Sequence, residues 1–461
     1  MKNKKDLDLL NGPITPLILK LTAPMMISTL IRNSYFFVDM AFASFLGGVQ
    51  IASVAFVTPM FNTLNALGMG ITNGGVGVIA KAIGEENYEK ASEYAIQLRY
   101  IILILAGVIS VLGAVFSTSI IEIMGIEGEL LTESITYSKI VFFTIPFSLI
   151  SSIYATLFQS QGKMNIQTIM TAITFTGNTA LNALFVLVFK RGIEGLAYAS
   201  LITQVVQTLI VYGMYYREKH QFSLPARIFA SKMKLPIIKD LLKMGLPLSF
   251  SQSSSSFGFM LCNIFVARYG YEVVAAYAIG NRINTFFYGP AMGFGRGTVP
   301  LVAQNLGNRN LARIKEIANK NMLYSFIFGI VGAFGLMLIM PPLNRFLSKD
   351  NLVIMEHVRN YTRLMSWAMI PWSLFQCMSG IFNGLQKTAL TMSITMVRLW
   401  VLRIPGIALF YYVLPSFAEY GVWYTMFFSN VFTAVFALAC FFIYIPRHIY
   451  PNIEADSIPS S

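Results

Sequence analysis

Long apolar runs alternate with short polar stretches along the whole of this chain. A run of about 20 apolar residues is long enough to cross a bilayer as a helix. Twelve such runs occur, at roughly 14–45, 50–81, 94–120, 134–160, 165–189, 193–216, 238–268, 273–304, 318–343, 360–385, 388–414 and 418–446. The pattern predicts an all-α integral membrane protein with 12 transmembrane helices.

The second half of the chain repeats the first. Segment 46–87 aligns without gaps on segment 269–310, an offset of 223 residues. Six spans per half is an even number, so both halves insert the same way up and form a parallel internal repeat, as in many transporters. We therefore expect an N-terminal lobe at 1–216, a cytoplasmic linker at 217–237, and a C-terminal lobe at 238–461 that ends in a short cytoplasmic tail.

A repeated helix bundle also occurs in channels and in receptor-like proteins. Here, however, the first two helices of each half are rich in Gly and Pro, which weaken straight helices. Helices that bend or move during the working cycle account for this composition better than a static scaffold does. The repeat and its composition together favour a transporter.

Composition supports a membrane setting and argues against a nucleic-acid partner. Of 461 residues, 55% are hydrophobic and only 12% are charged, whereas a soluble domain has about 25% charged residues. A net charge of +13 would suggest nucleic acid in a soluble protein, but here the excess Lys and Arg follows the loops expected in the cytoplasm. The sequence predicts a cell-membrane protein with both termini cytoplasmic and no nucleic-acid partner.

Signatures of enzyme chemistry are missing. Cys262, Cys377 and Cys440 lie far apart in apolar stretches, and no metal-spaced pair or phosphate-binding loop occurs. At membrane depth there is no carboxylate dyad, Ser–His pair or His–Asp cluster. We expect a protein that is not an enzyme and that needs no cofactor.

One acid stands inside the first apolar run. Asp39 lies in "NSYFFVDMAFASFLGG", and a charge at the bilayer centre costs about 2.5–3.5 kcal/mol on insertion scales. A structural alternative is an ion pair with Arg32, but seven residues along a helix span about 10.5 Å, which is long for direct contact. An ionisable residue inside a membrane is usually functional, so Asp39 is the first candidate site residue.

Four short segments carry a resemblance to a known family. "VDMAFASFLGG", "QSQGK", "LVAQNLGNRN" and "RLWVLRIPG" occur in this order across the spans, and the chain resembles the multidrug and toxic compound extrusion (MATE) family over nearly its whole length. The resemblance implies two six-helix lobes in a V-shaped transporter fold. It also implies a monomeric antiporter in membrane lipid that exports small amphipathic, often cationic compounds against inward flow of protons or sodium ions.

Within that family, the chain is most similar to the branch whose N-lobe holds the ion site. The resemblance places the cation-coupling residues at Asp39, Asn178, Asn182 and Ser200. "GNTALNALF" departs from the branch pattern N-x-x-x-D-P, because Asn182 replaces the second acid. The acids that a second known MATE site needs, on helices seven and ten, are absent. Alternatively, the two Asn side chains are interhelical hydrogen-bond partners and Ser200 is a packing residue.

The coupling ion is not fixed by this set of residues. Either a proton or a sodium ion neutralises one carboxylate, and no metal is expected beyond sodium at the same four residues. Asn182 stands where the branch has its second acid, and Ser200 stands where it has a Thr. These replacements weaken a cage of oxygen ligands more than they weaken an acid, so we favour protons.

The sequence leaves two further questions open: whether the chain is a flippase, and what the C-lobe arginines do. The same superfamily contains flippases for lipid-linked oligosaccharides, which should need several buried Arg or Lys residues in both lobes, whereas the N-lobe offers mainly Arg32 and Lys139. The C-lobe spans contain Arg296, Arg398 and Arg403. These arginines either snorkel to lipid headgroups or give the lobe a positively charged lining, and the sequence assigns them no role.

Overall fold

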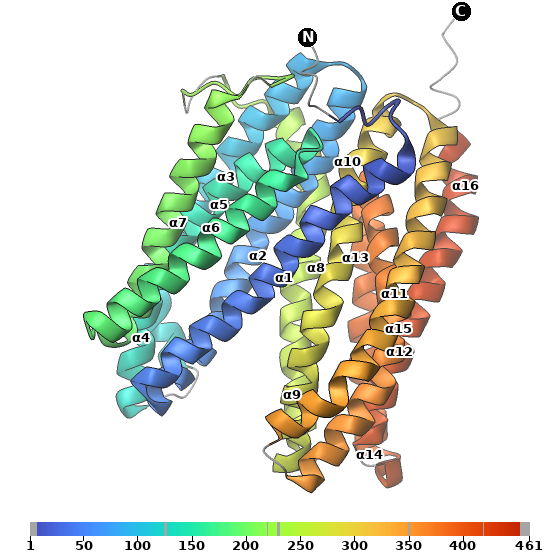
Figure 1. Cartoon of the computed structure of the whole chain (residues 1–461). Helices are drawn as coiled ribbons and strands as arrows, with labels where there is room; N and C mark the ends of the chain where they lie inside the picture. Colours follow the sequence, from blue (N-terminus) through green and yellow to red (C-terminus); the bar gives the residue numbers. More distant parts are fainter. Residues whose placement is uncertain are drawn as a thin grey trace, which may run out of the picture. The chain divides into compact units, whose positions relative to one another are not determined.

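The computed structural model describes residues 7–123, 127–218, 220–227, 231–348, 351–417 and 419–451. Throughout these ranges the regular elements are helices, and no strand occurs among them (Figure 1). In the expected linker, Lys219 and residues 228–230 lie outside the described residues, and in the expected tail residues 452–461 do.

The first half of the chain folds into six helical segments, as the hydrophobic pattern predicts. They comprise α1 (Ile14–Leu46), α2 (Gly48–Gly84), α3 (Tyr88–Ile123), α4 (Gly128–Phe142) with α5 (Thr144–Ser160), α6 (Met164–Asn182) with the π-helix η1 (Ala183–Val188), and α7 (Gly192–Arg217). Helices α4 and α5 are separated only by Phe143 and together fill the predicted span 134–160.

The second half folds into six more segments. They comprise α8 (Leu235–Ala267), α9 (Tyr271–Tyr288) with the 3₁₀ turn η2 (Gly289–Ala291) and α10 (Met292–Gly307), α11 (Leu311–Leu347), α12 (Leu352–Gly384), α13 (Thr388–Met396) with the π-helix η3 (Val397–Arg403) and α14 (Ile404–Tyr412), and α15 (Tyr420–Ala439) with the π-helix η5 (Cys440–Tyr444) and α16 (Ile445–His448); a 3₁₀ turn, η4 (Pro415–Phe417), precedes α15. The predicted all-α fold with twelve helical segments is confirmed.

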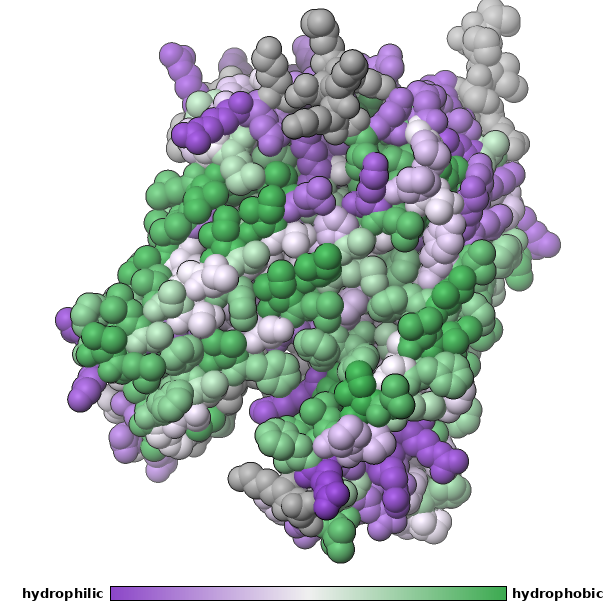
Figure 2. Space-filling model, in the orientation of Figure 1, coloured by the Kyte–Doolittle hydropathy of each residue, from purple (hydrophilic) through white to green (hydrophobic). Residues whose placement is uncertain are grey.

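Most of these segments are apolar enough to cross a membrane. In the described part of the chain, nine of them meet that condition by length and composition. The other three are α8, the α9–α10 segment and α12, and α8 carries the polar run "SFSQSSSS". Figure 2 shows hydrophobic residues over the middle of the helices on the visible face, with hydrophilic residues gathered mainly toward their ends.

Contacts within the chain define two compact units. Unit 1 comprises residues 1–7 and 30–253, and unit 2 comprises residues 8–29 and 254–461. The first part of α1 thus belongs to the unit built mainly from the second half of the chain, and the first part of α8 belongs to the unit built mainly from the first half. The lobe boundaries expected from the repeat, 1–216, 217–237 and 238–461, stay a prediction.

Each unit is built around one long, buried helix. In unit 1, α2 packs against α3, α4 and α5, and α5 packs against α7. In unit 2, α12 packs against α9, α10, α11 and α15, and the side chain of Trp423 from α15 is fully buried beside Tyr361 of α12.

Two segments, residues 8–29 and 235–253, belong to the unit built mainly from the other half of the chain, and we call them the exchanged segments. Glycines allow these segments to pack closely. A Cβ atom added at Gly74 of α2 would lie 2.7 Å from the backbone nitrogen of Gly245 in α8, within unit 1. A Cβ atom added at Gly297 of α10 would lie 2.9 Å from the carbonyl carbon of Leu21 in α1, within unit 2. Gly74 and Gly297 are equivalent positions of the sequence repeat, so both halves use the same contact.

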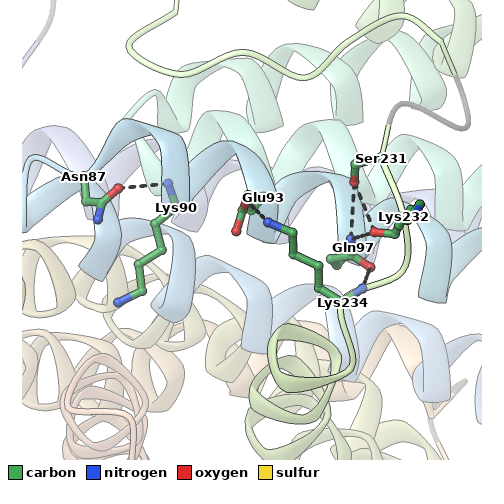
Figure 3. A network of polar contacts seen from close by, with 7 residues as sticks. All are labelled: Asn87, Lys90, Glu93, Gln97, Ser231, Lys232 and Lys234. Carbon is green, nitrogen blue, oxygen red and sulfur yellow. Dashed lines mark hydrogen bonds and ion pairs between the residues drawn. The ribbon is translucent and has the colours of Figure 1, made fainter.

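The connection between the two halves lies along α3. Gln97 donates a hydrogen bond to the Lys232 carbonyl oxygen at 2.9 Å and accepts one from the Lys234 backbone N–H at 3.2 Å. Lys234 also forms an ion pair with Glu93, and the Ser231 side chain completes this network (Figure 3). The described part of the linker is therefore attached to unit 1 by specific backbone contacts.

Candidate functional site

The four predicted coupling residues come from three helices of unit 1. Asp39 lies on α1, Asn178 and Asn182 lie one turn apart in the last turns of α6, and Ser200 lies on α7. Helix α6 packs against α7, which brings the two amides beside the hydroxyl. At Asn182 the α-helix ends and the π-helix η1 begins; π-helical turns are frequently found at functional sites.

Hydrogen bonds join all four side chains into one network. The Asn182 amide nitrogen donates to Asp39 Oδ1 at 2.7 Å and to Asn178 Oδ1 at 2.7 Å. The Asn178 amide nitrogen donates in turn to Ser200 Oγ at 3.3 Å. Residues that are up to 161 positions apart in the sequence thus form a single polar cluster in an apolar setting.

A fifth member of this network was missed by the sequence analysis. The Tyr35 hydroxyl lies 3.4 Å from Ser200 Oγ and is also a hydrogen-bonding partner of Asp39. Tyr35 precedes Asp39 by four residues on α1, and side chains at that spacing are neighbours on a helix surface. The spacing was therefore a usable signal, but an aromatic residue in a membrane span is more often a packing residue.

The network keeps a buried oxygen without a donor. The Asn178 and Asn182 side chains are 1% and 0% exposed, and Asp39 is half-buried. Asn182 donates its N–H groups to Asp39 and Asn178, and its carbonyl oxygen accepts no hydrogen bond from any described residue. Buried acceptors are normally satisfied, and this one lies beside a carboxylate. The cluster is therefore suited to receive a proton or a cation.

The structural alternative for Asp39 is not supported. Arg32 is exposed, and in the described ranges no ion pair joins it to Asp39. The carboxylate is instead held by an amide and a phenol, which are neutral groups. Nor do three His, Cys, Asp or Glu side chains gather at any one place within the described residues.

In unit 2 the position equivalent to Asp39 is not an acid, and two arginines are buried. The repeat partner of Asp39 is Cys262, which is fully buried in an apolar cluster with Tyr277 and Trp423. On the segment from α13 to α14, Arg398 and Arg403 are 3% and 5% exposed. This burial argues against snorkelling of either side chain to lipid headgroups.

The two buried arginines have different surroundings. Arg403 Nε donates to Ser429 Oγ at 3.0 Å, and Arg403 Nη2 donates to Asn430 Oδ1 at 2.9 Å. The Arg398 guanidinium lies over the rings of Trp372 at 5.0 Å and Phe375 at 5.6 Å. The third arginine, Arg296 on α10, is half-buried.

A family model matches the chain twice. The MatE model covers residues 24–184 and 247–409, which is more than half of the chain. The two matched segments start at equivalent positions of the internal repeat and include the helices that carry Asp39 and Arg398.

Curated relatives cover much or nearly all of the chain. One is similar over 437 residues at 24% identity, covering 91% of this chain and 90% of the relative: the "Probable multidrug resistance protein YoeA" of Bacillus subtilis. Another is similar over 310 residues at 27% identity, covering 66% of this chain and 67% of the relative: the "Multidrug export protein MepA" of Staphylococcus aureus.

Solved structures share the fold. A multidrug resistance MATE family transporter of the MOP superfamily in an outward-facing conformation superposes with a TM-score of 0.90 at 22% identity, covering 99% of this chain and all of that one. A MOP superfamily transporter from Pyrococcus furiosus, described as having a binding pocket of reversed polarity, gives a TM-score of 0.90 at 23% identity over 98% of this chain. These likenesses show that the chain shares the fold of these solved structures.

Proposed function

Because this chain belongs to the MatE family, we propose that it is a secondary active antiporter that exports amphipathic drugs or toxic compounds in exchange for an inward-moving cation. The names of the two curated relatives, a multidrug resistance protein and a multidrug export protein, support this activity. The observation that carries the coupling step is the network of Asp39 with Asn182, Asn178, Ser200 and Tyr35. Among the described residues, this network contains one acid, no basic side chain, and one buried carbonyl oxygen, of Asn182, that accepts no hydrogen bond.

A carboxylate in this position is a natural site for reversible neutralisation. Burial makes the charged form costly unless a counter-charge is present. Binding of a proton or cation removes the cost, and its release restores it, so occupancy and conformation are coupled. An exchange cycle needs such a group, since the same site must be filled on one side of the membrane and emptied on the other.

We propose the proton as the coupling ion. A sodium ion requires oxygen ligands pointing at it, whereas Asn182 points its N–H groups at Asp39 and Asn178. This donor arrangement suits a carboxyl group that exchanges a proton and would have to be reorganised around a sodium ion. Sodium coupling remains the competing proposal for the same residues.

The experiment that tests the function is dye export from proteoliposomes with proton and sodium gradients imposed separately. Ethidium is a suitable dye because it is fluorescent, amphipathic and cationic. Export driven by a proton gradient alone is the expected result. Full-rate export driven by a sodium gradient at matched pH would reverse the ion assignment, and absence of export under either gradient would reject the antiport proposal for this class of compound.

The orientation expected from charge completes the proposal. We propose that the chain resides in the cell membrane with both termini and the linker in the cytoplasm, because Lys and Arg are concentrated in the loops of that side. The flippase alternative has weaker support. It should need several buried basic residues in both lobes, but Arg32 and Lys139 are both exposed. Arg99 is buried, but it is bonded to carbonyl oxygens of the linker.

A further inference from the structure

Arg398 is a buried cation whose counter-charge is not supplied by the described protein. The side chain is 3% exposed, and its Nε atom is buried without a hydrogen-bond partner. No acceptor for this guanidinium is found in the described ranges, and its contacts are with the ring faces of Trp372 and Phe375 of α12. Arg403, five residues further on, is by contrast bonded to Ser429 and Asn430.

The contacts of Arg398 compensate for only part of the free-energy cost of burying its charge. An Arg side chain stays protonated in proteins, and removal of a charge from water costs several kcal/mol unless a partner compensates for it. A desolvated cation–π contact contributes about 2 kcal/mol, which offsets only part of that cost. Arg403 does not help, since it is a second positive charge nearby.

Lipid headgroups are too distant to supply the missing charge. Arg398 lies ten residues into the helical segment that runs from Thr388 to Tyr412, which places it about 15 Å from the nearer end at 1.5 Å per residue. A bilayer core is about 30 Å thick, so this position is close to its middle. The π-helix η3 begins at Val397, and π-helical turns commonly mark functional sites.

We propose that Arg398 binds a carboxylate group of the transported compound. One unpaired guanidinium balances one negative charge, which favours a monoanion over a doubly charged phosphate. The planar guanidinium also matches a carboxylate in geometry. This inference rests on the proposed export function and refines it: the substrates include compounds with a carboxylate, and cationic compounds alone do not describe the class.

Trp372 is one of the two aromatic residues whose rings lie against the Arg398 guanidinium. Its side chain is half-buried, stacks on Tyr288 with ring centroids 6.0 Å apart, and donates a hydrogen bond to the Tyr288 carbonyl oxygen at 3.3 Å. The ring thereby offers an apolar surface beside the cation. An amphipathic carboxylate would place its charge on Arg398 and its apolar body against these aromatic side chains.

A matched series of probes tests this site directly. Pyrenebutyrate, pyrenebutanol and pyrenebutylamine share one apolar body and differ in charge. We expect the purified full-length chain in detergent at pH 7 to bind pyrenebutyrate about tenfold more tightly than pyrenebutanol, as a charge-assisted hydrogen bond predicts, and pyrenebutylamine most weakly. Fluorescence titration gives the three dissociation constants. Equal affinity for the acid and the alcohol, or no binding of any probe, would overturn the proposal.

Variants assign the preference to Arg398. Arg398→Gln should reduce the difference between acid and alcohol to less than about twofold, and Arg398→Lys should keep part of it. Arg268→Gln is the matched control, because Arg268 also lies over two aromatic rings of unit 2 but is exposed. An unchanged preference in a folded Arg398→Gln variant would contradict the assignment. If that variant does not fold, Arg398→Lys and the wild-type comparison decide.

This test fails independently of the export proposal. Binding is measured without any gradient, so a preference for the acid together with absent dye export would reject antiport and keep the anion site. Gradient-driven export of ethidium together with equal probe affinities would keep antiport and reject the site.

Discussion

At the scale of single residues, Asp39 is the group on which coupling depends. Asp39→Asn should abolish gradient-driven export while leaving the fold intact, because the amide has the shape of the carboxyl group and cannot exchange a proton. The measurements are dye export from proteoliposomes and thermal unfolding in detergent. Asp240→Asn is the control, since Asp240 is an exposed acid of unit 1 that accepts a hydrogen bond from Tyr94. Normal export by the Asp39→Asn variant would remove Asp39 from the mechanism.

Because Asn182 is a neutral amide, the same network contains only one carboxyl group, that of Asp39. Asn182→Asp places a second carboxyl group where the amide nitrogen now lies 2.7 Å from Asp39 Oδ1. Two carboxylates in contact repel each other, so the pair holds one proton to higher pH than a single acid does. We expect the pH optimum of export to rise by roughly one unit or more, measured as rate against pH. Asn182→Leu, which adds no charge, should reduce the rate without this upward shift; an optimum that stays in place in Asn182→Asp would contradict the argument.

Some of the site residues could be predicted from the sequence and others could not. Asp39 was conspicuous because a charge is costly in an apolar run, and Asn178 and Asn182 share one face of a helix at a spacing of four. Their contact with Asp39 and Ser200 followed only from resemblance to a family, since it joins three separate helices. Tyr35 and the isolation of Arg398 were not predicted, because the partners of a side chain depend on tertiary packing that one sequence does not encode locally.

At the scale of helices, small residues determine how closely neighbours approach. Gly74→Ala and Gly297→Ala should each destabilise the protein by about 1–3 kcal/mol, the usual cost of adding atoms to a packed contact. The added Cβ atoms would lie within 3.0 Å of backbone atoms of α8 and α1 respectively, and backbone cannot rotate away. A lowered midpoint of thermal unfolding in detergent is the expected observation.

Gly107 of α3 provides the control for this prediction. A Cβ atom added there meets nothing within 4 Å, and Ala is favoured over Gly inside a helix by roughly 0.5–1 kcal/mol. Gly107→Ala should therefore leave the unfolding midpoint unchanged or raise it slightly. Equal midpoints for Gly74→Ala and Gly107→Ala would show that the α2–α8 contact is looser than these distances imply.

The linker is held by a second set of contacts on α3. Arg99, which is 5% exposed, donates from Nη1 to the Pro225 carbonyl oxygen and from Nη2 to the Arg227 carbonyl oxygen, both at 2.6 Å. Arg99→Gln removes both bonds, so trypsin should cleave the linker several times faster in this variant. Lys90→Gln on the same helix should not change the rate, because its ion pair with Glu85 is on the surface and contributes little. An unchanged rate in Arg99→Gln would mean that the linker is held without Arg99, by Gln97 and by Tyr100, whose hydroxyl donates to the Ser231 carbonyl oxygen at 2.8 Å.

At the scale of the whole molecule, the repeat in the sequence and the units in the structure do not begin at the same residues. The hydrophobic pattern marks where helices lie, but a long helix such as α1 or α8 reads as one continuous element in sequence. The structure assigns the start of each to a different unit from its end. The sequence repeat pairs Gly74 with Gly297, which indicates that the two positions are equivalent. It does not predict that these glycines contact α8 and α1.

The exchange predicts how a divided chain should behave. If the chain is cut in the linker and residues 1–234 and 235–461 are co-expressed, the two pieces should co-purify in detergent. Each piece then contains a segment that packs into the unit formed mainly by the other piece. Residues 235–253 place Leu241 and Met244, which are 0% and 6% exposed, in the core of unit 1. Residues 8–29 place Leu21 in unit 2. Shortened pieces, 30–234 with 254–461, lack both segments and should co-purify much less. Equal recovery of the two pairs would show that the exchanged segments do not hold the halves together, and the expected lobes at 1–216 and 238–461 would then describe the folding units better.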